Sequence, residues 1–169
     1  HQVAHHTLTW QHDAPITQNI QARAREARYQ CIEEFCKRHD ISYVFLAHHL
    51  EDQAETLLQR LMRASGTKGL SGMKPIQRYH RLTLVRPLLT TYKTQLVSFL
   101  QTHHVSWLED PSNQDGRYDR THIRKWIKSA HAPDQLCEQL SKVATHMQRA
   151  DDYIDTQIQR CMTSLVTFH

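Results

Sequence analysis

Apolar residues recur along part of the chain with helical spacing and elsewhere in short uninterrupted runs. Between Gln18 and His39 the apolar positions lie four, three, four and four residues apart, which predicts an amphipathic helix. The apolar run Tyr43–Ala47 is bounded by polar residues, as in a strand that is buried on both faces. A helical pattern resumes over 51–63. This part of the chain therefore alternates helix and strand.

The alternation extends in both directions. Val3–Trp10, Leu82–Val85 and Val105–Trp107 are short segments that predict strands, and a helix is predicted near Tyr92–His103. Strands that alternate with helices favour a parallel α/β sheet. Towards the carboxyl end no further strand is predicted, and Asp134–Thr167 has a helical pattern throughout.

The composition is that of an ordinary globular protein, since 39% of the 169 residues are hydrophobic and 22% are charged. No apolar stretch approaches the ~20 residues of a membrane helix, so no membrane association is expected. Four irregularly spaced cysteines are typical of reduced thiols, which favours a cytoplasmic protein. The net charge of +4 suits a polyanionic partner such as nucleic acid without requiring one.

Two imidazoles and two carboxylates follow the strand predicted at Tyr43–Ala47. His48 and His49 come at its carboxyl end, where open α/β sheets bind ligands, and Asp52 and Glu55 share one face of the next helix. A carboxylate there can hold a Mg²⁺ ion that bridges phosphate oxygens. It can equally stabilise the helix dipole without any ligand. Adjacent histidines on a strand point to opposite faces, which disfavours chelation of zinc by the pair.

Gly66, Gly69 and Gly72 are three of the four glycines in the chain. Glycines permit positive φ and a close approach of backbone N–H groups to an anion, so this segment is a candidate phosphate loop. An ordinary turn between helix and strand is an equally good interpretation, because the spacing matches neither the Walker loop nor the dinucleotide-binding fingerprint.

Basic residues gather at two places. Arg28 lies at the border of the apolar stripe of the first helix, where we expect it to be partly packed and able to present its guanidinium to a phosphate. A second group carries Tyr118 and Trp126 among its charges, a mixture suited to phosphate contact and base stacking. Its members are Arg117, Arg120, His122, Arg124, Lys125 and Lys128. Solvated helix faces have similar compositions.

Several segments occur in the order found in one enzyme family. They are Ala24–Tyr29, His48–Thr56 with Arg60–Arg63, Ser65–Met73, Arg86–Leu89 with Lys93, Trp107–Asn113, and Tyr118–Arg120 with Ile123–Arg124. Over about residues 1–128 the chain thereby resembles the bacterial tRNA(Ile)-lysidine synthetases, which are PP-loop ATPases. Residues 129–169 resemble the connecting region of the family more loosely.

The resemblance implies an α/β fold with a Rossmann-like parallel sheet of the adenine nucleotide alpha-hydrolase type, followed by an α-helical segment. Residues 1–128 would form the C-terminal part of the catalytic domain and 129–169 the helical connecting segment. It also implies an activity. The enzyme would use ATP to adenylate C2 of the wobble cytidine in tRNA(Ile) with a CAU anticodon, and free L-lysine would then displace AMP.

The resemblance also assigns roles to residues. Asp52 would hold Mg²⁺ on the ATP phosphates, and Arg28 and Arg124 would contact an ATP phosphate or the reacting cytidine as catalytic residues. Together with Arg28 and Asp52, His48 would bind ATP. Contacts with tRNA are implied for Arg63, Lys68, Arg117, Arg120, Arg124 and Lys125.

The chain departs from the family pattern in several ways. Glu51 stands where an Asp is usual, Ala64 where a Gly is usual and Thr121 where an Asn is usual. The family is known for binding ATP with a Ser-Gly-Gly-x-Asp-Ser loop, and this loop does not occur in the 169 residues. We therefore expect a fragment of a longer enzyme that is inactive by itself.

Three other functions remain open. One is a metal-dependent phosphohydrolase that uses His39, Asp40, His48, His49 and Asp52, and another is a non-catalytic RNA-binding module. Thiolating enzymes of the same ATPase group are closer rivals but commonly use paired cysteines. Cys31 and Cys36, five residues apart in the first helix, lie on different sides of it.

Overall fold

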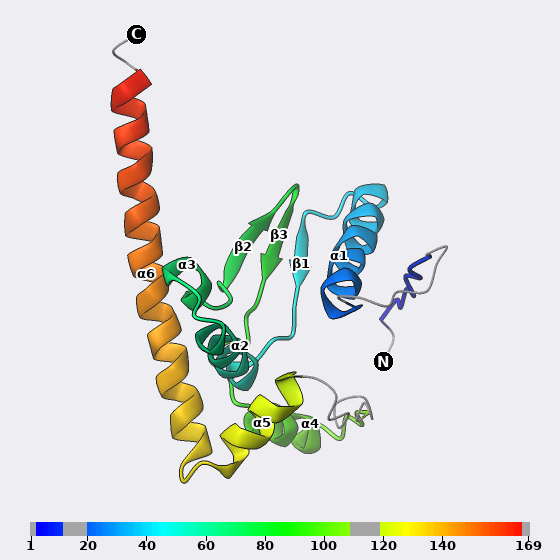
Figure 1. Ribbon diagram of the computed structural model, residues 1–169. Helices are drawn as coiled ribbons and strands as arrows, with labels where there is room; N and C mark the ends of the chain where they lie inside the picture. The colour runs from blue at the N-terminus through cyan, green and yellow to red at the C-terminus, as the bar shows by residue number, and fades with distance from the viewer. Residues whose placement is uncertain (1–2, 12–19, 109–118, 167–169) are drawn as a thin grey trace. The chain divides into compact units, whose positions relative to one another are not determined.

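The computed structural model describes residues 3–11, 20–108 and 119–166. These residues form two compact units (Figure 1). The strand unit comprises the residues up to Phe45 together with Ile76–Val85, and the helical unit comprises Leu46–Pro75 and the residues from Arg86 onward. The division into a catalytic part, 1–128, and a connecting segment, 129–169, stays a prediction.

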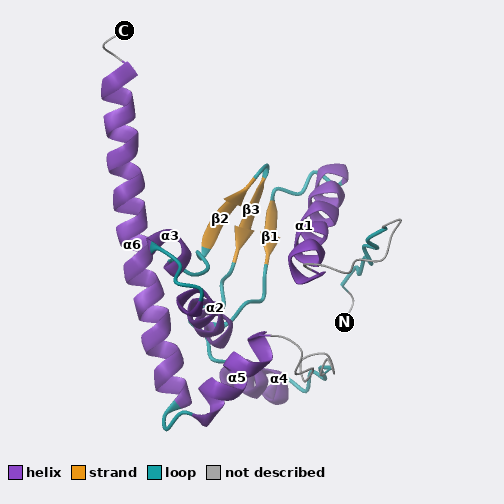
Figure 2. Cartoon of the chain, in the orientation of Figure 1, coloured by secondary structure: helices purple, strands orange, loops and turns teal. Residues whose placement is uncertain are grey.

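The strand unit contains helix α1 (Ile20–Arg38) and three short strands, β1 (Tyr43–Phe45), β2 (Ile76–Tyr79) and β3 (Leu82–Val85). The strands lie in the order β1-β3-β2, with β1 parallel and β2 antiparallel to β3 (Figure 2). The predicted helix and the strands at 43–47 and 82–85 are confirmed. The sheet is mixed, because the hairpin β2–β3 adds an antiparallel pair to the parallel one.

The hairpin was not predicted from the sequence. Ile76, Gln77 and Arg78 are all exposed, so β2 has no alternation of apolar and polar positions. Its turn contains His80 with a φ of 48° and lacks the glycine that usually marks such a turn. Conversely, the predicted strands Val3–Trp10 and Val105–Trp107 are wrong, because neither segment forms a ladder with any described residue.

The predicted burial of β1 on both faces is also wrong. Tyr43 is 63% exposed and Phe45 71% exposed. β3 is the central strand and buries Leu82 and Leu84, whereas β1 has a ladder partner on one side only within the described part of the chain. A strand between two partners has the better-covered side chains, which a short apolar run cannot reveal by itself.

The helical unit consists of α2 (Leu50–Met62), α3 (Thr67–Leu70), α4 (Lys93–Thr102), α5 (Asp119–Ser129) and α6 (Pro133–Val166). The predicted helices at 51–63, 92–103 and 134–167 are confirmed as α2, α4 and α6 as far as the described residues extend. The long helix α6 packs against α2, α3 and α5 (Figure 1). None of the helices in the described ranges is both long and apolar enough to cross a membrane.

The core of the helical unit joins α2, α5 and α6. Leu50 and Ala54 of α2 pack with Ile123 and Ile127 of α5 and with Cys137 of α6. Partly buried side chains complete the cluster, namely Leu58, Tyr92 and Leu140. This core fixes the start of α2 against α5, which brings the predicted acidic and basic residues together.

Candidate functional site

The candidate site is an acidic cluster at the start of α2. His49 is the last residue before the helix, and its N–H donates a hydrogen bond of 3.1 Å to Oδ2 of Asp52. The same Asp52 oxygen lies 3.4 Å from Nε2 of His49, and Glu51 lies 2.9 Å from Nδ1. Asp52 thus caps the helix, as the sequence allowed, within a cluster of two carboxylates and an imidazole.

Electrostatics couple His49 to its acidic neighbours. Burial disfavours the charged imidazole, but the hydrogen bond to Glu51 and the charges of Asp52, Glu51 and Glu55 outweigh it and raise the pKa of His49. Burial likewise disfavours the Glu51 carboxylate, but its hydrogen bonds to His49 and to the Lys93 N–H outweigh it and lower the pKa of Glu51. His49 and Glu51 therefore favour each other's charged form.

A second ion pair connects α2 to α5. The Glu55 side chain is only 3% exposed and accepts hydrogen bonds from Nε of Arg124 at 2.7 Å and from Nη2 at 3.1 Å. The hydrogen bond with Glu55 raises the pKa of Arg124. One turn earlier on α5, Nη2 of Arg120 lies 3.5 Å from Oγ1 of Thr56. A buried carboxylate needs such compensation, so Glu55 fixes the orientation of the Arg124 guanidinium.

Most of the predicted binding residues lie in the helical unit. Together with Asp52, the half-buried His48, Arg120 and Arg124 belong to it. So do the exposed residues Arg63, Lys68 and Lys125, which lie at the end of α2, on α3 and on α5. Arg117 lies outside the described residues.

Arg28 belongs to α1 of the strand unit and is exposed, so the expectation that it is partly packed is wrong. Its sequence neighbours Ala27 and Tyr29 are both buried. Because successive residues turn by ~100°, residue 28 points to the side opposite the face that residues 27 and 29 bury.

The glycine-containing segment 66–72 is built differently from the candidate phosphate loop. Thr67–Leu70 forms the short helix α3, and of the three glycines in this segment Gly72 alone has a positive φ, 64°. Nη1 of Arg60 donates hydrogen bonds to the carbonyl oxygens of Gly69 and Gly72. Several carbonyl groups of this segment are thus held by side chains, as in a structural turn.

Two glutamines missed by the sequence reasoning hold the end of the same segment. Gln53 donates to the Met73 carbonyl at 2.9 Å and accepts from the Met73 N–H at 2.8 Å. Gln148 of α6 donates to the carbonyls of Ser71 and Met73. The signal in the sequence was weak, because a glutamine on a helix is usually solvated.

Arg86, part of the segment that resembles the family, is another buried residue. It is 2% exposed, and its Nη1 donates a hydrogen bond of 2.8 Å to the Lys74 carbonyl. Its N–H donates to the carbonyl of Pro75 at 2.7 Å. Arg86 therefore connects residues 74–75 to the segment that precedes α4, and this role is structural.

Comparison with known proteins places the chain in a family. The model of the PP-loop domain family matches residues 1–131. The chain belongs to the PP-loop domain family. The predicted membership of the PP-loop ATPases and the predicted fold class are thereby confirmed, and the three strands described here are part of this PP-loop domain.

The chain is similar to proteins named tRNA(Ile)-lysidine synthase. That of Wolbachia pipientis wMel is 39% identical over 143 residues, which cover 85% of this chain and 33% of the relative. The protein of this name from Ruegeria pomeroyi is 40% identical over 137 residues, which cover 81% of this chain and 33% of the relative. The protein of this name from Actinobacillus succinogenes is 46% identical over 108 residues, which cover 64% of this chain and 25% of the relative. The chain spans about a third of the length of the first two of these relatives.

Proposed function

We propose that this chain is part of a tRNA(Ile)-lysidine synthase, an ATP-dependent carbon–nitrogen ligase. The observation that carries the proposal is similarity to proteins of that name at 35% to 46% identity. The helical unit supports it, since α5 bears basic residues and packs against the helix that begins with the acidic cluster.

The proposed reaction has two steps. The O2 atom of the wobble cytidine attacks the α-phosphorus of ATP, and the bond to pyrophosphate breaks. The ε-amino nitrogen of free L-lysine then attacks C2, the C2–O bond breaks, AMP leaves and the amine loses a proton. Presenting C2 requires the base to leave its stack, which costs a few kcal/mol and less in a loop than in a duplex.

Asp52 fits the proposed magnesium site. It supplies a hard carboxylate oxygen in the first turn of α2, and Mg²⁺ in nucleotide sites commonly takes one or two carboxylates, water and substrate phosphates. The ion would offset negative charge on the phosphates. Asp52 has a structural use as well, because it accepts the His49 N–H.

Arg124 and Arg28 are the proposed contacts to phosphate or cytidine, and His48 is a proposed part of the ATP site. Glu55 orients the Arg124 guanidinium through two hydrogen bonds, so the charge is placed before any substrate arrives. Arg63, Lys68, Arg120 and Lys125 would contact the phosphates of tRNA(Ile), which adds affinity without sequence readout. We place the reaction in the cytoplasm.

The alternatives have less support. Within the described ranges, no three His, Cys, Asp or Glu side chains group as a metal site, so nothing there favours a metal-dependent phosphohydrolase. A non-catalytic RNA-binding module would use the same basic residues. It would not release pyrophosphate from ATP.

The test is ATP–pyrophosphate exchange with the full product of the gene that encodes this chain, in the presence of tRNA(Ile) with a CAU anticodon. Asp52→Asn should reduce the rate of exchange at least about 100-fold, which is the usual effect of losing one electrostatic contact to the transition state. It should leave tRNA binding unchanged. Asp155→Asn, an exposed substitution on α6, is the matched control.

Exchange at the unsubstituted level in Asp52→Asn would contradict the role of Asp52. If the unsubstituted protein forms no lysidine from ATP, lysine and this tRNA, the proposed function is wrong.

A further inference from the structure

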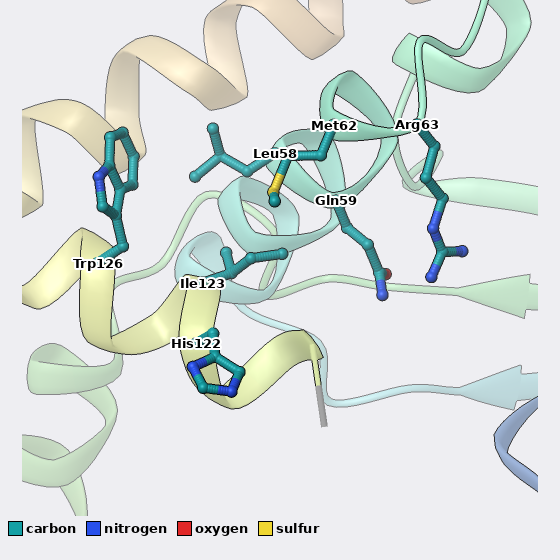
Figure 3. Close-up of a pocket in the computed structure, with 7 residues that line it drawn as sticks. All are labelled: Leu58, Gln59, Met62, Arg63, His122, Ile123 and Trp126. Atoms are coloured by element: carbon teal, nitrogen blue, oxygen red, sulfur yellow. The ribbon is translucent and has the colours of Figure 1, made fainter. Parts of the chain in front are cut away.

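A pocket opens between α2 and α5 within the helical unit (Figure 3). Its volume of about 790 Å³ lies in the range of small-ligand sites. The residues that line it are Leu58, Gln59, Met62, Arg63, His122, Ile123 and Trp126. The proposed ATP and magnesium residues are not among them.

The lining combines an apolar wall with an aromatic ring and polar edges. Leu58, Met62 and Ile123 provide the apolar part, while Trp126 is 57% exposed. In Figure 3 the indole of Trp126 and the guanidinium of Arg63 lie at opposite sides of the pocket. An exposed indole beside an apolar wall is a surface on which a flat ring can stack.

The pocket lining carries a positive charge. None of the described residues that line it is acidic, and Arg63 contributes a cation. Lys125 is exposed beside Trp126 in the sequence, and Lys128 is exposed further along α5. The one acidic residue within α5 is Asp119, at its first position. An occupant with a planar ring and a negative charge therefore matches the pocket better than an apolar peptide does.

We propose that this pocket receives one unstacked nucleotide of the RNA, with its base on Trp126 and its phosphate towards Arg63 or Lys125. The inference rests on the proposed function and adds to it a contact with a base outside the reaction centre. Stacking is tolerant of base identity because every base has a π-face. Gln59 and His122 add hydrogen-bonding groups to the lining of the pocket.

The test measures binding of an RNA hairpin with a CAU anticodon loop to this chain by fluorescence anisotropy. Trp126→Ala should weaken binding at least about fivefold, the lower end for loss of one stacked base. Trp126→Phe should retain most of the affinity. Phe99→Ala removes an aromatic side chain of similar exposure, 60%, from α4 and should change nothing. Circular dichroism of each variant verifies folding.

A second RNA identifies the base. In a series of hairpins that each lack one loop base, the hairpin without the base that stacks on Trp126 should bind the unsubstituted chain more weakly than the others. In the Trp126→Ala variant that difference should disappear. Binding that is independent of both Trp126 and every loop base would overturn the pocket assignment while the proposed function stands. Binding of no hairpin by the unsubstituted chain would overturn the assignment, while lysidine formation by the full gene product would still decide the proposed function.

Discussion

Single residues around the start of α2 form two ion pairs that differ in burial. Glu55 is almost fully buried and is held by Arg124 from α5. His49 and Glu51 are each about a fifth exposed and lie within the same stretch of chain. The Arg124 side chain is 34% exposed, so Glu55 is the buried member of its pair, and losing the contact leaves the Glu55 charge without compensation, whereas water can replace part of the contact between the partly exposed His49 and Glu51. The two pairs should therefore respond differently to substitution and to pH.

Glu55→Gln keeps the shape of the side chain but removes its charge. We expect a loss of about 1.5–3 kcal/mol in the free energy of unfolding, typical of hydrogen bonds to charged groups. The same substitution at Glu138, in an exposed pair with Lys142, should cost clearly less, because water screens that pair. Urea unfolding of the two variants measures both values. Equal losses would contradict the special role of Glu55.

The His49 imidazole should make stability depend on pH. Its pKa in the folded chain is raised above 6.5, so its contribution is complete below about pH 6.5 and is lost as the pH rises through the folded value. The difference in free energy of unfolding between the unsubstituted chain and His49→Gln should accordingly be larger near pH 6 than near pH 9.

Glu51 does not obscure this effect, since its lowered pKa keeps it ionised across that range. In a Glu51→Gln background the pH dependence should shrink. If the difference in free energy of unfolding between the unsubstituted chain and His49→Gln grew with pH, the expected direction of this pH dependence would be wrong.

At the scale of elements, segment 66–72 shows that composition alone leaves two interpretations open. Its glycines allow a phosphate loop or an ordinary turn, and side chains from α2 and α6 hold its carbonyl groups as in a turn. A Cβ at Gly69 would lie 2.5 Å from Cβ of Ser65, but of the three glycines it is Gly72 that combines crowding with a positive φ. A Cβ there would lie 2.9 Å from Oε1 of Gln53 and 3.1 Å from Cβ of Ala144, at a positive φ.

Gly72→Ala should therefore destabilise the chain by about 2–3 kcal/mol, the sum of the left-handed conformation and the crowding. Gly66→Ala is the matched control, because a Cβ at residue 66 would have nothing within 4 Å of it and the φ there is −71°. It should cost no more than about 1 kcal/mol, as expected at a helix N-cap. Thermal and urea unfolding compare the two, and an equal effect would contradict this account.

For the whole molecule, α6 organises the helical unit along only part of its 34 residues. Cys137, Ala144 and Asp151 are buried, whereas Ile154 and Ile158 are 43% and 51% exposed. Apart from Asp151, apolar residues continue at helical spacing beyond the buried part, so periodicity predicted the length of α6 but not where its contacts end. The same limit applies to β1, whose apolar run predicted a strand but not its exposure.

The sequence by itself determined α1, α2, α4 and α6, two of the three strands in the described part of the chain, and the PP-loop family, but it did not predict α5. These depend on local periodicity and on ordered motifs, both of which are readable along the chain. The tertiary structure alone decided that Glu55 holds Arg124, that Gln53 and Gln148 hold the glycine segment, and that Trp126 borders a pocket. Those outcomes depend on residues far apart in the chain, and only the packing of α2, α5 and α6 brings them into contact.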